Sequence, residues 1–306
     1  MHEGSRRAIA AAFFANFGIA IAKFVAFLAT GAASMLAESI HSLADTGNQG
    51  LLFLGGARAK RAPSEMHPFG YGRERYFWAF VVALVLFSMG SMFALYEGIN
   101  KLVNPHEIDS PEWAIGVLTV AIVLEIFSLR TAVHEANKVR GQRGWWQFIR
   151  TSKSPELPVV LLEDVGALVG LVFALVGVST AALTDEPAFD AMGSIAIGLL
   201  LGVIAVILAI EMKSLLIGEA AAPEDQTAIR SAIETSPEVD RLIHLRTEHL
   251  GPEDLLVAAK VDLVSGGDAT TAKAIDAVEA RIRAATPRAK VIYIEPDEFR
   301  DTSEPA

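Results

Sequence analysis

The chain has 306 residues, of which 52% are hydrophobic, with a formal net charge of −10 and a mean hydropathy of +0.39. This composition is rare for a soluble domain of that length, and the negative charge argues against nucleic-acid binding. The sequence has no cysteine, which excludes disulfides, thiolate zinc sites and cysteine nucleophiles.

The apolar residues are concentrated in six segments, each long enough to cross a lipid bilayer as a helix. They cover residues 8–30, 33–57, 76–102, 113–136, 157–183 and 190–216. The first segment follows Arg6 and Arg7 and is longer than the apolar part of a signal peptide, so it is expected to be a retained helix. The sequence therefore predicts a multi-pass integral membrane protein.

The connecting segments differ sharply in charge. Lysine and arginine are frequent in the loops 58–75 and 137–156, whereas the segments 104–112 and 184–190 carry acidic residues and neither lysine nor arginine. The positive-inside rule then predicts that both termini are cytoplasmic. We expect a bacterial-type inner or cell membrane.

The last ninety residues are less apolar and show shorter periodicities. Alternation and helical spacing predict a helix, two strands joined at Gly251-Pro252, a second helix and a third strand. Their ranges are 223–235, 239–249, 254–263, 269–285 and 290–295. The order αββαβ predicts a small α+β domain with a three-stranded sheet and both helices on one face. The expected division is a membrane domain, a cytoplasmic dimerisation or regulatory domain and a disordered tail, at 1–217, 218–298 and 299–306.

Charged side chains within a membrane span are costly and are functional candidates by default. The second span contains Glu38, His41 and Asp45. His41 and Asp45 are four residues apart and so lie on one helix face, where an imidazole and a carboxylate offer two ligands of the kind zinc prefers. The alternative is a structural His–Asp hydrogen bond that joins two helices.

The fifth span contains a second acidic pair, Glu163 and Asp164. If the second and fifth spans touch, Asp164 would join His41 and Asp45, with Glu163, Glu38 or water completing a tetrahedron. Glu163 and Asp164 lie about 100° apart around the helix, so both cannot point straight at one ion. The small residues Gly166 and Gly170 are expected to bring this span close to the second one.

Three motifs carry a family resemblance: HSLADT (41–46), HPFGYGRERY (67–76) and VVLLEDVGALVG (159–170). Together with six spans and an αββαβ domain, they resemble the cation diffusion facilitators, most closely the zinc transporter nine branch. The resemblance implies a homodimeric antiporter that exports Zn²⁺ from the cytoplasm in exchange for H⁺. It also implies that His41, Asp45 and Asp164 bind the transported ion.

The chain departs from the family pattern in the membrane and in a loop. The ligand position one turn before Asp164 is Val160, so Glu163 substitutes, three protein ligands suffice, or selectivity has moved to Mn²⁺, Fe²⁺ or Co²⁺. A family accessory site would include His67, but its second histidine is Tyr71 here. Only weak binding is expected there.

The C-terminal domain offers His244, Glu248 and His249 where family members often hold a binuclear site. On a regular strand the two histidines would face opposite sides. We interpret them as solvent-exposed residues and expect dimerisation without metal.

Three other functions are compatible with buried charges in a membrane. One is a proton-coupled carrier of a small organic solute, and another is an intramembrane metalloenzyme, although the sequence has no HExxH run. The third is a scaffold that transports nothing. We expect a secondary transporter and no enzyme.

Overall fold

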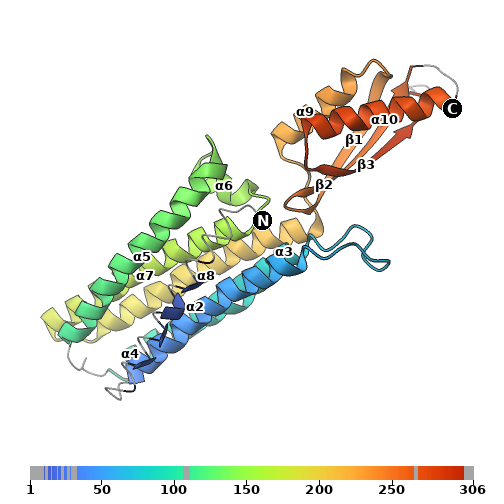
Figure 1. The fold of residues 1–306 in the computed structure, drawn as a ribbon. Coiled ribbons are helices and arrows are strands. Elements are labelled where there is room, and N and C mark those ends of the chain that lie inside the picture. The colour runs from blue at the N-terminus through green and yellow to red at the C-terminus, as the bar shows by residue number, and fades with distance from the viewer. Residues whose placement is uncertain are drawn as a thin grey trace. The chain divides into compact units, whose positions relative to one another are not determined.

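A computed structural model describes residues 10, 13–14, 16–18, 20–21, 24–25, 28, 33–105, 111–264 and 268–299. Contacts divide the chain into two units, one of Met1–Ala57 with Arg75–Lys213 and one of Arg58–Glu74 with Ser214–Ala306 (Figure 1). The first predicted span, 8–30, falls mostly outside the described residues.

The first unit is helical. Its elements are α2 (Ala33–Arg58), α3 (Glu74–Val81), the π-helix η1 (Val82–Phe87), α4 (Ser88–Val103), α5 (Pro111–Arg140), α6 (Trp145–Thr151), α7 (Glu156–Thr184) and α8 (Ala188–Ile217). In the described part of the chain, four segments are long and apolar enough to cross a membrane: Glu74–Val103, Pro111–Arg140, Glu156–Thr184 and Ala188–Ile217. They correspond to four of the six predicted spans. With 26 residues, or about 39 Å, α2 is long enough to be a fifth but is not among those four.

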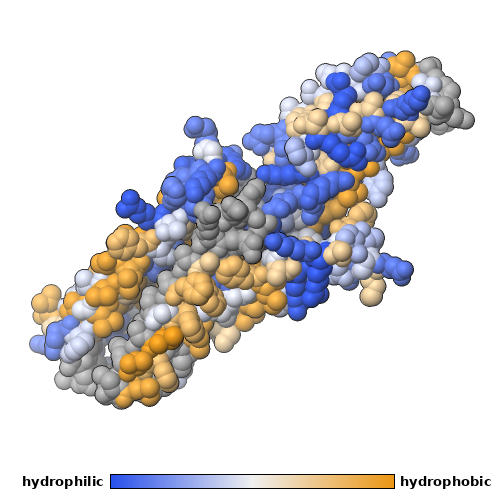
Figure 2. Space-filling view, viewed as in Figure 1, coloured by the Kyte–Doolittle hydropathy of each residue, from blue (hydrophilic) through white to orange (hydrophobic). Residues whose placement is uncertain are grey.

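Large apolar side chains cover the outside of these helices. Val120 and Phe127 of α5 and Leu199 and Val203 of α8 are all more than half exposed. Figure 2 shows hydrophobic residues over much of the helical unit, whereas hydrophilic residues predominate on the C-terminal sheet domain. Exposed apolar surface on this scale indicates contact with lipid.

Glycines allow the helices to pack closely around α8. Gly177 of α7 and Gly193 of α8 face one another, and a Cβ on either would lie 3.0 Å from a backbone oxygen of the other helix. A Cβ on Gly166 would meet Ile204, and one on Gly170 would meet Ile197, both on α8. The prediction that these two glycines bring α7 to α2 is therefore wrong. The glycine face of α7 packs against α8, whereas polar side chains make the contact of α7 with α2.

The second unit contains the predicted αββαβ order. Its elements are α9 (Pro223–Glu234), β1 (Val239–Gly251), β2 (Asp254–Leu263), α10 (Asp268–Ala285) and β3 (Ala289–Pro296). The sheet order is β1-β2-β3, with an antiparallel first pair and a parallel second pair. Alternate residues of β2 pack on the helices, which contribute Ile229 and Ile233 from α9 and Val278 and Ile282 from α10 to one core. At the end of this domain, the ring of Phe299 packs under the guanidinium of Arg241, and residues 300–306 fall outside the described part.

Two local features were not predicted from the sequence. The loop 137–156 contains α6, whose Phe148 is buried with Ala136 and Leu157. The loop 58–74 belongs to the second unit, where Gly72 touches the backbone of Leu250 and Gly251 at the β1–β2 turn.

Candidate metal site in the helical unit

The site begins with a contact between α2 and α7. Gln49 Nε2 donates a hydrogen bond of 2.7 Å to Glu163 Oε1, and Asn48 Nδ2 donates one of 3.4 Å to the same oxygen. All three side chains are buried. The two helices therefore touch, as a site shared between them requires.

The second acid of α7 points toward another helix. Asp164 is buried and accepts a hydrogen bond of 3.1 Å from Ser128 Oγ of α5. The roughly 100° between neighbouring residues on a helix explains why Glu163 has its partners on α2 and Asp164 on α5. The acidic pair of α7 thus spans the space between these two helices.

Asp45 brings a third carboxyl group to this region. It lies on α2, half-buried, one turn before Gln49, and interacts electrostatically with both Glu163 and Asp164. Three carboxyl groups this close repel one another when ionised, and low polarity strengthens the repulsion. A divalent cation bound between them would relieve it.

Two predicted ligands have undescribed side chains. Glu38 and His41 lie on α2, about two turns and one turn before Asp45, but only their backbone is described. Within the described residues, no group of three or more His, Asp or Glu side chains is arranged to hold a metal ion. The ligand set of His41, Asp45 and Asp164, with Glu163 or Glu38 as a fourth ligand, therefore stays a prediction. Val160, one turn before Asp164, is buried and offers no donor.

The other candidate positions differ in their surroundings. The ring of His67 is exposed and lies 4.6 Å from the ring of Tyr71, whose hydroxyl is 3.1 Å from Ser64 Oγ. An accessory site at His67 also stays a prediction. The expectation that both domain histidines are exposed is wrong for His249, which is fully buried and donates from Nδ1 to the Gly251 carbonyl. His249 lies at the β1–β2 turn, where Gly72 of the loop 58–74 rests against the neighbouring Leu250 and Gly251.

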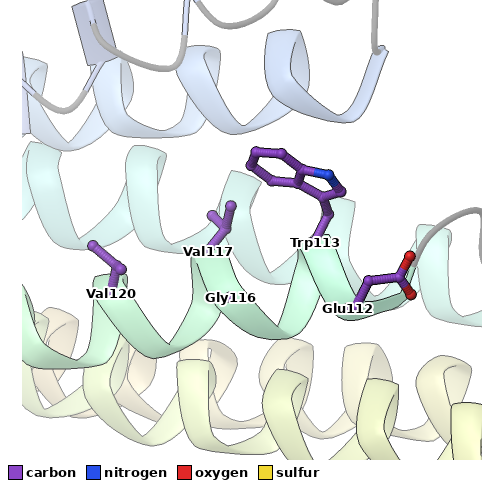
Figure 3. A pocket seen from close by; sticks show the side chains of 5 residues that line it. All are labelled: Glu112, Trp113, Gly116, Val117 and Val120. Carbon is purple, nitrogen blue, oxygen red and sulfur yellow. The ribbon is translucent and has the colours of Figure 1, made fainter.

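A hollow on the helical unit has none of the candidate ligands in its lining. It is lined by Glu112, Trp113, Gly116, Val117 and Val120, all on α5 (Figure 3). Glu112 is the one charged group in this lining, so the hollow lacks the several ligands that a metal ion needs.

Sequence reasoning missed the neutral polar residues of the site. Asn48, Gln49 and Ser128 carry no charge and so did not stand out, yet they donate hydrogen bonds to Glu163 and Asp164. The signal was the pair of adjacent amides within a predicted membrane span, since buried amides need hydrogen-bond partners.

The comparison with known proteins defines the class. The family model of the cation efflux transmembrane domain matches residues 9–217, more than half of the chain. The chain therefore belongs to the cation efflux family of membrane proteins, and the resemblance drawn from the sequence motifs is confirmed.

Individual relatives narrow the branch. The chain is 33% identical over 242 residues to the mouse (Mus musculus) and human (Homo sapiens) proteins named "Proton-coupled zinc antiporter SLC30A9, mitochondrial". It is 30% identical over 262 residues to "Metal tolerance protein C4" of Arabidopsis thaliana. These matches cover 78% and 85% of the chain but 43% and 57% of the relatives, so the chain spans about half their length. A further relative, "Magnetosome protein MamB" of Paramagnetospirillum magneticum, is 25% identical over 79% of the chain and 77% of its own length.

Proposed function

We propose that this protein exchanges a divalent metal ion, Zn²⁺, for protons across a membrane. The observation that carries the proposal is the meeting of α2 and α7 at buried acidic side chains, with Asp45 acting electrostatically on Glu163 and Asp164. The name of the SLC30A9 relatives, a proton-coupled zinc antiporter, supports the same cargo and coupling ion.

The mechanism follows from competition for one set of groups. Zn²⁺ binds His41, Asp45 and Asp164 in their deprotonated forms, so binding releases protons. When the helices expose the site to the other side, protons compete with the metal for these groups. His41 is the most sensitive competitor, because an unperturbed imidazole titrates near physiological pH.

The charge of the loops supports an orientation. Lysine and arginine in 58–75 and 137–156 favour the cytoplasmic side for these loops and for both termini, in a bacterial-type inner or cell membrane. Export from the cytoplasm would then be the direction of metal transport. The domain that begins near residue 218 would hold two copies of the chain together as a homodimer.

Selectivity among divalent ions depends on the ligand set. One imidazole and two carboxylates suit Zn²⁺ or Co²⁺, whereas a set richer in carboxylate shifts the preference toward Mn²⁺ or Fe²⁺. We assign Zn²⁺ because His41 is part of the proposed set. A carrier of an organic solute would instead show proton-coupled uptake without metal dependence.

Transport by proteoliposomes that contain a zinc-sensitive dye tests the proposal. Asp45→Asn and Asp164→Asn keep side-chain size and are expected to lower the zinc transport rate at least about tenfold, since even indirect partners of metal ligands contribute 10–100-fold. Asp185→Asn is the matched control, because Asp185 is exposed after α7 in a left-handed conformation that asparagine tolerates. Zinc transport at the wild-type rate in both site variants would refute the assignment.

A further inference from the structure

Three side chains form a buried polar cluster between α2 and α7. Asn48, Gln49 and Glu163 are 4%, 0% and 8% exposed, and the two amides both donate to Glu163 Oε1. The single oxygen of each amide and the other oxygen of Glu163 take no part in these hydrogen bonds.

Those remaining oxygens have no hydrogen-bond partner in the described part of the chain. They are Asn48 Oδ1, Gln49 Oε1 and Glu163 Oε2. The amide orientations are fixed by the carboxylate, because turning either amide over would place its oxygen against Glu163 Oε1. The cluster therefore presents three buried acceptors, and neither amide donates to Glu163 Oε2.

Unsatisfied acceptors at this depth destabilise the fold. A buried acceptor without a partner keeps its full desolvation penalty, and the penalty is larger for a charged acceptor than for a neutral one. A bound group that satisfies all three must be positive or must carry several donors. One carboxylate and two amide carbonyls form an all-oxygen set, which suits hard cations such as Mg²⁺ and Mn²⁺ better than Zn²⁺.

We propose that Asn48, Gln49 and Glu163 form a second cation subsite, distinct from the His41, Asp45 and Asp164 set, that binds a hard divalent cation of the Mn²⁺ class. Asp45 lies one turn before Gln49 on α2, so its charge adds to the attraction for a cation. Glu163 is then a ligand of this subsite and leaves the fourth position of the zinc site to another group. If transported ions bind this subsite on their way across the membrane, that role rests on the proposed function. Cation binding at the subsite does not depend on it.

Binding of Mn²⁺ to the purified full chain in detergent tests the subsite. Electron paramagnetic resonance measures free Mn²⁺ directly, and a competing dye measures zinc affinity on the same sample. Glu163→Gln keeps the side-chain size and an oxygen that accepts from both amides. It is expected to weaken Mn²⁺ binding at least about tenfold, since even indirect partners of metal ligands contribute 10–100-fold, and to weaken Mn²⁺ binding more than zinc binding.

A second variant keeps the subsite testable if Glu163→Gln fails to fold. Asn48→Leu removes one free oxygen at similar volume and is expected to weaken Mn²⁺ binding while zinc affinity is retained. Glu112→Gln, an exposed acid at the start of α5, is the matched control and should bind both ions as the wild type does.

Three results would overturn the subsite. They are an absence of Mn²⁺ binding by the wild type, unchanged Mn²⁺ binding in both variants, and an equal loss of Mn²⁺ and Zn²⁺ in Glu163→Gln, which would return Glu163 to the zinc site. The proposed function fails separately, if Asp45→Asn and Asp164→Asn transport zinc normally while Glu163→Gln still loses Mn²⁺.

Discussion

Arg75 and Glu156 form an ion pair at the start of two helices of the first unit. Arg75, the second residue of α3, donates from both Nε and Nη2 to the carboxylate of Glu156, the first residue of α7, and the Nη2 bond is 2.8 Å long. The two side chains are only 5% and 1% exposed. The neighbouring Tyr76 donates from its hydroxyl to the carbonyl of Lys153 just before α7, so two contacts join the same segments.

Removal of one partner of this pair should be much more harmful than removal of both. Glu156→Leu removes the carboxylate that pairs with the buried Arg75 guanidinium, and we expect it to lower the free energy of unfolding by about 3–5 kcal/mol. The double variant Arg75→Met with Glu156→Leu should recover most of that loss, because a buried pair and an apolar pair of similar volume have similar stability. Thermal unfolding of the full chain in detergent measures both.

An ion pair of the same unit with an exposed arginine provides the control. Arg150 is 59% exposed, and its Nε is 3.2 Å from an oxygen of Glu211, which is 13% exposed. Arg150→Met should change the free energy of unfolding by no more than about 1 kcal/mol. If Glu156→Leu were no more harmful than this control, the pair would be unimportant for stability.

Glycine contacts set the distance between helices in the same unit. A Cβ on Gly198 of α8 would lie 2.6 Å from Leu95 Cγ and 2.9 Å from the backbone nitrogen of Leu95, on α4. A Cβ on Gly98 of α4 would likewise meet Ile195 of α8. Since one obstacle at Gly198 is backbone, a side-chain rotation cannot remove it and the helices themselves must separate.

Gly198→Ala should therefore destabilise the protein by about 1–3 kcal/mol, the usual cost of extra atoms in a packed interface. Gly116→Ala on α5 is the control, because nothing lies within 4 Å of a Cβ there. Its expected effect is neutral or a gain of up to about 1 kcal/mol, since alanine favours a helix over glycine. Equal melting temperatures for the two variants in detergent would contradict the packing described.

The elements were largely predictable from the sequence, and the contacts between them were not. The long apolar runs predicted α5, α7 and α8 to within a few residues, because a single segment in lipid satisfies its backbone hydrogen bonds only as a helix. The short α6 carries no such signal, since seven residues give too little periodicity. Gly166 and Gly170 were recognised as a packing face, but the choice of α8 over α2 depends on tertiary structure.

The candidate site was likewise predicted only in part from the sequence. Charge in an apolar span marked Asp45, Glu163 and Asp164 as functional residues, whereas the neutral partners Asn48 and Gln49 became visible only in the contact between α2 and α7. Sequence separation explains this, because more than a hundred residues lie between the two halves of the contact.

For the molecule as a whole, the sequence predicted a membrane part and a small α+β part. It did not predict that the loop 58–74 would belong with the α+β part. There Arg73 pairs with Glu248 of β1, and Gly72 rests against the backbone of the β1–β2 turn. In the chain, this loop directly follows α2, which carries His41 and Asp45 of the proposed site.

The most direct test of the central claim is a crystal structure of the zinc-soaked protein with data recorded at the zinc absorption edge. The account predicts an anomalous peak between α2 and α7, with an Asp45 and an Asp164 oxygen each about 2.0–2.2 Å from the ion. It also predicts an imidazole nitrogen of His41 in the same coordination sphere. An ordered pair of carboxylates without a peak between them, in crystals that hold zinc elsewhere, would contradict the claim that these two helices share the transported ion.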